Sequence, residues 1–406
     1  MAYSGSGSGT ALDPYLITSW SQMAEMRDDL SAHYKLTTDL DADSTGYVGI
    51  GDTWEDYFPG TGTIKTGTAF QGSFDGDGHT VSDIVAKDSS VPYMGFIGFW
   101  VGDYVKNIII KNAEILGSTQ CGLVGSHRDK GDITNCAVVG GSITANDHRA
   151  GGIVGWQQVE TGKVENCYND GCSISVNGST GEAGGIIGQS RTGCQKCWSN
   201  AKVSASDHEG GIVGWDHDQG STILDCFWDW QVSDVKTSLD GAGKLTTEMK
   251  SIGTYNQTYT ETHSGVVSVT GFVVTLTSGD NFDTNWQEDD VINLNEISHV
   301  IESVDSTTQI TLKTEPIEGT GIDYSKGTGS YGLTTAWDMV SKGDYDDEIW
   351  FIDDGNDYPR LGFEYVAAGI LYHKASGAFG LKPIKYKASG SFAQKTLKVK
   401  DGGVWK

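Results

Sequence analysis

Short apolar segments flanked by glycines recur between residues 95 and 214 and dominate the hydrophobic pattern of the chain. Their closing glycines lie 27, 30, 33 and 26 residues apart. The segments lack the 3.6-residue spacing of an amphipathic helix and have the length of short buried strands. Repeats of about 30 residues that each carry one such strand predict a β-solenoid, in which successive coils stack through these strands. The five segments are Gly95-Phe96-Ile97-Gly98, Gly122-Leu123-Val124-Gly125, Gly151-Gly152-Ile153-Val154-Gly155, Gly184-Gly185-Ile186-Ile187-Gly188 and Gly210-Gly211-Ile212-Val213-Gly214.

A second marker, a polar residue followed by cysteine, runs in phase with the first. Its copies are spaced by 31, 30 and 29 residues. Because a free cysteine packs as a small buried hydrophobe, this spacing predicts a column of thiols inside the solenoid, and an odd total of seven cysteines argues against a disulfide framework. The four copies are Asn135-Cys136, Asn166-Cys167, Lys196-Cys197 and Asp225-Cys226.

These two markers together resemble the GLUG repeat family, and residues 70–81 resemble the opening segment of that family. Cys121 departs from the pattern, because a second glycine is usual there. The resemblance covers about half of the chain. It implies an all-β protein with a right-handed parallel β-helix over residues 68–256.

The open ends of a β-solenoid expose strand edges and need caps. Residues 1–67 are expected to form an N-terminal segment and cap, in which Ser19 and Gln22 have capping-box spacing at the start of a short helix. Met23, Met26 and Leu30 then form its apolar stripe.

Beyond the repeats, the GLUG-like pattern is interrupted. The closing Trp-Asp and Tyr-Pro-Arg-Leu motifs of similar proteins arrive at Trp337 and Tyr358, after about 80 further residues. This delay predicts a domain inserted at residues 257–332 and a solenoid closing segment at 333–366. The β-branched runs of the insert predict strands, and they resemble the small β-sandwich modules of tailed-phage tail and neck proteins.

The last 40 residues, 367–406, form a basic tail in a chain of net charge −26. Residues 374–386 repeat at 387–399, and the Lys-rich repeats resemble the C-termini of phage tail-associated proteins. They are expected to form strands that pair with another chain or with the body; a frayed, solvated tail is the alternative. The acidity of the remaining chain excludes a nucleic-acid-binding body, and it suits either high salt or simple solubility.

Asp-His pairs and tryptophans beside the Gly-Gly strands supply a candidate binding surface. The first two Asp-His pairs are expected to mark one corner of successive coils. Aromatic faces and carboxylates suit sugars, so glycan binding is one interpretation; a glycosidase built on a carboxylate pair and merely solvated corners are the others. The candidate binding residues are Asp147, His148, Trp156, Asp207, His208, Trp215, Asp216 and Asp218.

Other motifs give little support to catalysis. Cys194 and Cys197 form a lone Cys-x-x-Cys that lacks two of the four ligands of a structural zinc site, so core thiols are expected instead. The acidic run 353–357 is expected to be a turn rather than a calcium loop. No catalytic residue, metal or cofactor is therefore predicted.

The resemblances together predict a virion protein of a tailed virus, namely a tail fibre, spike or receptor-binding component. Its expected partners are other tail or baseplate proteins and a host surface glycan or glycoprotein. The protein is also expected to form a homo-oligomer, which would be a trimer by analogy with β-helical tailspikes. No run of 18 apolar residues predicts a membrane span, and the first residues lack the pattern of a secretory signal. The alternatives are an extracellular adhesin on the surface of a bacterium or archaeon, and a polysaccharide-degrading tailspike enzyme.

Overall fold

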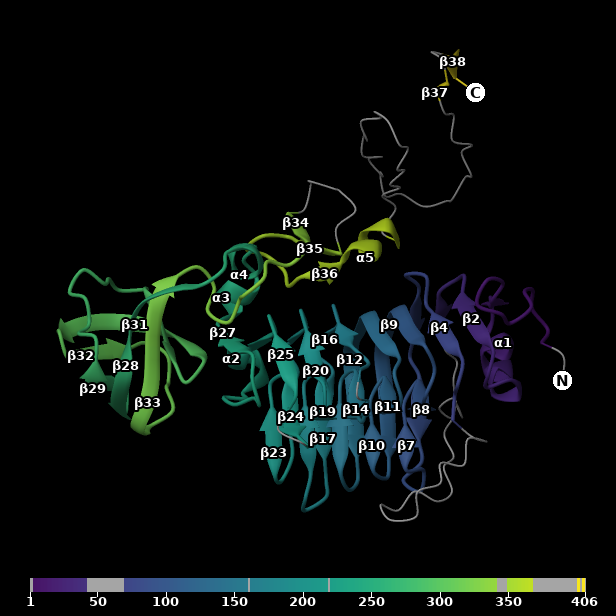
Figure 1. Cartoon of the computed structure of the whole chain (residues 1–406), viewed down its shortest axis with the longest axis horizontal. Helices are drawn as coiled ribbons and strands as arrows, with labels where there is room; N and C mark the ends of the chain where they lie inside the picture. The colour runs from purple at the N-terminus through teal and green to yellow at the C-terminus, as the bar shows by residue number, and fades with distance from the viewer. Residues whose placement is uncertain are drawn as a thin grey trace. The chain divides into compact units, whose positions relative to one another are not determined.

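The computed structural model describes residues 3–41, 69–159, 161–217, 220–341, 349–367, 400–401 and 404–405. Strands dominate these ranges, and they stack into the β-solenoid that the repeats predicted (Figure 1). The chain divides into two compact units, Met1–Gly362 and Phe363–Lys406.

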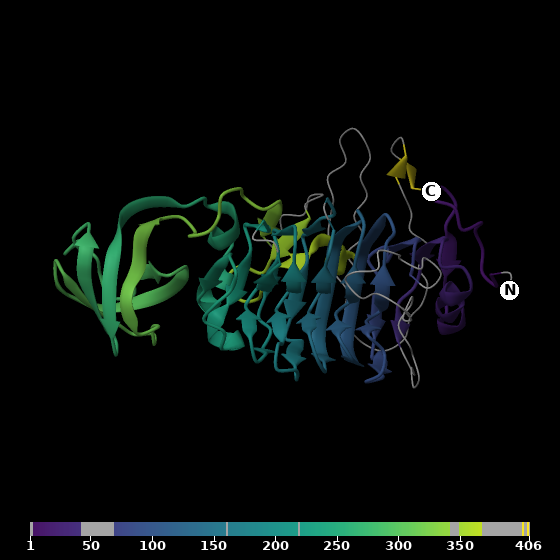
Figure 2. The ribbon, with the colours of Figure 1, turned by 60° about the horizontal axis from the view of Figure 1, so that its bottom comes forward.

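Each coil of the solenoid contributes one strand to each of two five-stranded parallel sheets, which Figure 2 shows side by side. Val124 pairs with Ile97 of the coil before and with Val154 of the coil after, so the predicted stacking of the apolar segments is confirmed. The first sheet comprises β7 (Tyr93–Met94), β10 (Gln120–Cys121), β13 (Arg149–Gly151), β18 (Glu182–Gly184) and β23 (His208–Gly210). The second comprises β8 (Ile97–Trp100), β11 (Val124–His127), β14 (Val154–Gln157), β19 (Ile187–Ser190) and β24 (Val213–Asp216).

The glycines of the repeat allow neighbouring coils to approach closely. A Cβ atom on Gly152 would lie 2.4 Å from the carbonyl oxygen of Gly185 in the next coil. A Cβ atom on Gly185 would lie 2.2 Å from the carbonyl oxygen of Gly211 one coil further on. Side chains larger than hydrogen are therefore excluded at this corner, which explains why Gly recurs there.

The third side of each coil belongs to a larger sheet. Its solenoid strands are β9 (Tyr104–Gly117), β12 (Asp132–Ala145), β15 (Val164–Glu165), β16 (Tyr168–Asp170), β17 (Ser173–Val176), β20 (Gly193–Gln195), β21 (Trp198–Ser199), β22 (Val203–Ser204), β25 (Thr222–Leu224), β26 (Phe227–Asp229) and β27 (Ala242–Lys244).

A left-handed backbone turn in this third side explains the second sequence marker. The polar residue before each cysteine has φ between +51° and +54°, a conformation that Asn and Asp tolerate better than other L-residues. The turn directs the following cysteine inward, and Cys136, Cys167, Cys197 and Cys226 are at most 1% exposed. The predicted thiol column is thus confirmed. The turn residues are Asn135, Asn166, Lys196 and Asp225, with Asn107 at the same place in the coil before.

The N-terminal residues extend the large sheet and carry the expected short helix, α1 (Trp20–Glu25). The Ser19 hydroxyl accepts a hydrogen bond from the backbone N–H of Gln22, and the Gln22 side chain accepts one from the N–H of Thr18. Met23 and Met26 are fully buried in the solenoid core. The remaining elements are β1 (Tyr15–Ile17), a 3₁₀ helix (Met26–Asp28), β2 (His33–Leu36), β3 (Leu40–Asp41), β4 (Ser73–Asp75), β5 (Thr80–Ser82) and β6 (Val85–Lys87).

Residues 260–328 form an antiparallel β-structure with a hydrophobic core of its own. Its pairings run β28–β29–β32–β31–β30–β33 and return from β33 to β28, so the sheet closes into a barrel. This differs from the expected sandwich, because closure leaves no separate second sheet. Ile297 pairs with Gly243, and the indole N–H of Trp230 donates to the Ser298 carbonyl, both contacts with the end of the solenoid. The strands are β28 (Thr260–Thr270), β29 (Val273–Gly279), β30 (Val291–Leu294), β31 (Ile297–Ser306), β32 (Gln309–Leu312) and β33 (Gly319–Thr328).

The segment after the barrel packs back against the third side of the solenoid. The indole N–H groups of Trp337 and Trp350 donate to the Asp225 carbonyl and the Asn166 side chain, two of the left-handed turn residues. The ring of Tyr358 stacks on Trp198 with 5.0 Å between centroids. This segment contains β34 (Met339–Ser341), β35 (Trp350–Ile352), β36 (Arg360–Leu361) and α5 (Gly362–Ala367), and the short helices α2 (Trp230–Ser233), α3 (Thr246–Met249) and α4 (Gly253–Asn256) precede the barrel.

Most of the basic tail, 367–406, lies outside the described residues. The two described pieces, β37 (Lys400–Asp401) and β38 (Val404–Trp405), pair antiparallel. None of the helices in the described ranges has the length and apolarity needed to cross a membrane.

Candidate functional site

Two rows of side chains run along the outside of the first two sheets, one residue per coil. In the first sheet Arg149, Glu182 and His208 are in register. The residues that follow the first two in the sequence, Ala150 and Ala183, point to the other side and belong to the core. In the second sheet the register row is Trp156, Gln189 and Trp215. We call these six residues the tryptophan face: Arg149, Trp156, Glu182, Gln189, His208 and Trp215.

Contacts between the two rows hold the side chains of the tryptophan face in place. Arg149 Nε donates to Glu182 Oε2 at 2.9 Å, and its guanidinium lies 4.2 Å from the centroid of the Trp156 ring. The His208 ring lies 4.0 Å from the Trp215 ring. Each indole is therefore accompanied by a planar nitrogen group, and cation–π contact adds to the packing where that group is charged.

The ion pair at the centre of this face is largely shielded from water. The Arg149 and Glu182 side chains are 18% and 13% exposed. Burial raises the pKa of the Glu182 carboxyl and lowers the pKa of Arg149, and each partner opposes the effect of burial on the other. A pair of this kind presents fixed donors and acceptors rather than mobile surface charges.

The structure brings together three of the residues that the sequence singled out, Trp156, His208 and Trp215. Asp207 accompanies His208 at 3.4 Å between carboxylate and ring nitrogen. Asp216 is only 6% exposed, and its carboxylate accepts a hydrogen bond from the backbone N–H of Ser221, so it lies away from the outer surface.

The remaining predicted residues lie elsewhere. Asp147 and His148 contact each other at 3.1 Å just before β13, while the second Asp-His pair lies at β23. Strand β18 separates these two strands, so the prediction that the pairs mark successive coils is wrong. In the coil of β18 the residues that directly precede Glu182 are Thr180 and Gly181, so this coil has no Asp-His pair there. Asp218 lies outside the described residues.

Sequence reasoning missed Arg149, Glu182 and Gln189 in this face. Their signal is the place of each residue relative to its Gly-Gly motif: Arg149 and Glu182 each stand two residues before the first glycine. Counting from that glycine, rather than searching for similar residue types, would have aligned them.

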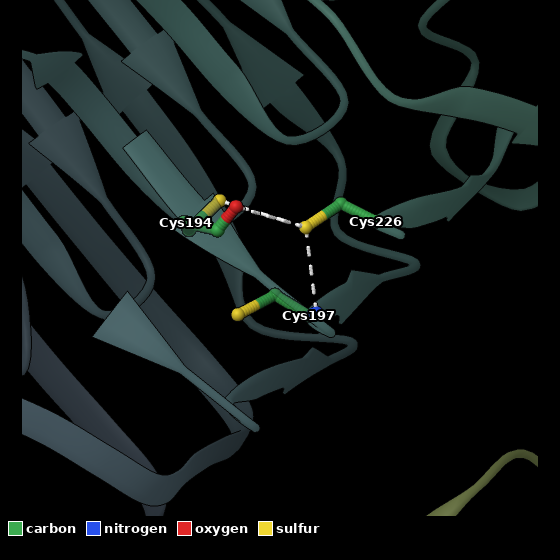
Figure 3. A group of neighbouring side chains, drawn as sticks. All are labelled: Cys194, Cys197 and Cys226. Carbon is green, nitrogen blue, oxygen red and sulfur yellow. Dashed lines mark hydrogen bonds between the residues drawn. The ribbon is translucent and has the colours of Figure 1, made fainter. Parts of the chain in front are cut away.

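A second constellation lies inside the solenoid, where the sulfur atoms of Cys194, Cys197 and Cys226 are all within 4.8 Å of one another. The lone Cys-x-x-Cys of the sequence thus acquires a third thiol from the next coil (Figure 3).

Comparison with known proteins finds a relative in sequence and a likeness to a solved structure. The chain is 30% identical over 162 residues to Halomucin of Haloquadratum walsbyi, a match that covers 38% of this chain and 2% of that protein. A solved structure, of a candidate immunoglobulin A1 protease from Bacteroides ovatus, is 23% identical with a TM-score of 0.45 over 55% of this chain and 68% of that one. That likeness is too low to inform function. No family model matches the chain, so the resemblance to GLUG repeats stays an expectation.

Proposed function

We propose that this chain is a module of an adhesin-like cell-surface protein, and that its tryptophan face binds a glycan. The observation that carries the proposal is the pairing of two outward indoles, Trp156 and Trp215, with the shielded Arg149–Glu182 pair beside them.

The chemistry of this face suits a sugar chain. Trp156 and Trp215 are two coils apart, and strands one coil apart are separated by about 4.8 Å, which gives roughly 10 Å between the two indoles. Indole rings cover the apolar faces of pyranose rings, while the Arg149 guanidinium and the Glu182 carboxylate offer donors and acceptors to hydroxyl groups. A rigid row of this type loses little conformational entropy on binding.

The similarity to Halomucin, a protein of an archaeon, favours an extracellular, cell-surface setting over a virion. The net charge of −26 is compatible with function in high salt, one of the two interpretations of the composition. A virion receptor-binding protein, predicted from the resemblance of the insert and tail to phage modules, would use the same face. Labelling of intact cells and of purified virus particles with an antibody against this chain separates the two settings.

The binding test compares the wild-type chain with a Trp156→Ala, Trp215→Ala double variant on an array of archaeal and bacterial surface polysaccharides. We expect the double variant to lose at least about fivefold in affinity, because two aromatic contacts of about 0.5–1.5 kcal/mol each contribute about 1–3 kcal/mol together. Phe272→Ala is the matched control, since Phe272 is an aromatic residue, 46% exposed, on the barrel.

Equal binding by the wild type and the double variant would refute the proposed face. Release of new reducing ends from a bound polysaccharide would instead favour the depolymerase alternative.

A further inference from the structure

One interior position of the solenoid breaks the pattern of its column. Two residues before each left-handed turn residue, the other coils place a branched aliphatic side chain, namely Val105, Ile133, Val164 and Ile223. The coil of β20 places Cys194 there instead, and Cys194 pairs with Ile223 in the register of the sheet. A thiol fills less volume than a branched aliphatic side chain, so packing alone does not favour cysteine at this position.

This substitution creates a thiol cluster rather than one more core cysteine. The Cys194 and Cys226 sulfur atoms are 3.7 Å apart, and Cys197 completes a triangle within 4.8 Å. The backbone N–H of Cys197 donates to the Cys226 sulfur at 3.4 Å, an interaction that stabilises a thiolate (Figure 3). Thiolates on one ion with metal–sulfur bonds of about 2.3 Å are separated by roughly 3.8 Å, so the triangle needs only a small contraction.

We propose that Cys194, Cys197 and Cys226 bind one thiophilic cation, Zn²⁺ or Cu⁺, which ties the coil of β20 to the coil of β25. Thiolate sulfur is the ligand that these two ions prefer. Each coordinating thiol releases its proton to solvent when the ion enters, and no atom changes oxidation state. Three thiolates satisfy Cu⁺, whereas Zn²⁺ takes a fourth ligand in addition to them.

The cluster lies next to a hollow in the surface of the solenoid. Cys194 is among the residues that line a hollow of about 420 Å³ on the outside of β15, β20 and β25. It is 4% exposed, while Cys197 and Cys226 are 0% and 1% exposed. Each thiol must lose its proton before it binds an ion, so ion binding should strengthen as pH rises.

The test titrates the reduced, metal-free full chain with Zn²⁺ or Cu⁺ in competition with a chromophoric chelator. We expect about one ion per chain, thiolate-to-metal charge-transfer absorption with Cu⁺, and a higher unfolding midpoint. Cys194→Val restores the residue type of the neighbouring coils, so this variant should fold yet lose the bound ion. Cys172→Ala is the control, because Cys172 is a fully buried thiol outside the triangle and its loss should leave binding unchanged.

Two results overturn the proposal. One is equal ion binding by the wild type and Cys194→Val, or no binding by either. The other is a wild-type chain that resists reduction under native conditions and carries a Cys194–Cys226 disulfide, revealed by a mass two hydrogens lower.

Discussion

A buried histidine in the solenoid should make its stability sensitive to acid. His127 is fully buried, it stacks on Trp100 with 4.7 Å between ring centroids, and its register partner in the next coil is Gln157. Burial lowers the pKa of His127 to about 3, against a smaller opposing contribution from the backbone of Gly131. We predict that His127→Gln, which copies the residue of the next coil, removes most of this sensitivity.

The sign and size of the effect follow from proton linkage. Below a pH of about 6.5, the unfolded chain protonates this imidazole while the folded chain does not, so the free energy of unfolding falls as pH falls. Each unit by which the pH falls lowers the free energy of unfolding by about 1.4 kcal/mol, which amounts to roughly 3 kcal/mol between pH 6.5 and pH 4. The loss ends near pH 3, where the folded form also takes up the proton.

Urea unfolding at pH 7.5 and pH 4, followed by tryptophan fluorescence, measures this difference. The wild type should lose about 3 kcal/mol more than His127→Gln between these two pH values, because contributions from all other groups cancel. His148→Gln is the matched control, since its side chain is 43% exposed, and it should follow the wild type. Parallel pH profiles for the wild type and His127→Gln would refute the reasoning.

Two further substitutions test the packing between coils and the closing segment. Gly152→Ala places a Cβ atom 2.4 Å from the carbonyl oxygen of Gly185 and should lower the free energy of unfolding in urea by about 2–4 kcal/mol. Gly220→Ala is the control, because its new Cβ atom meets open space, and it should change that free energy by no more than about 0.5 kcal/mol. Equal effects of the two substitutions would show that this corner can relax. Arg360→Lys weakens a partly buried contact with Asp170 at 2.7 Å and should cost about 1–2 kcal/mol in the same assay, and no change would mean that this ion pair does not anchor the closing segment.

The interior of the solenoid could be predicted because each coil repeats the same physical requirements. Gly152 must leave room for the next coil, and Asn166 must adopt a left-handed turn, so both residue types recur at fixed places and reveal the coil length. The closed barrel could not be predicted in the same way, since the pairing of β28 with β33 joins residues about 60 apart and leaves no local pattern.

The outer surface was harder to predict because its residues obey no shared packing rule. Trp156 and His208 stood out by residue type, but Arg149 and Glu182 became visible only once the register of neighbouring strands was known. The lengths of the intervening loops differ between coils, so spacing in the sequence does not translate directly into neighbours on the surface.

This contrast explains how one fold can carry both the tryptophan face and the thiol cluster. In a solenoid each coil contributes one side chain to every row, so a single substitution changes one row at one level and leaves the backbone register intact. Trp156 and Trp215 flank Gln189 in an outer row, and Cys194 interrupts an inner row of branched aliphatic residues. Substitutions in an outer row change the stability of the fold little, so the residues of that row can be adapted to a ligand. Substitutions in an inner row reduce the volume that fills the core, so a cysteine at position 194 is consistent with the proposed ion site.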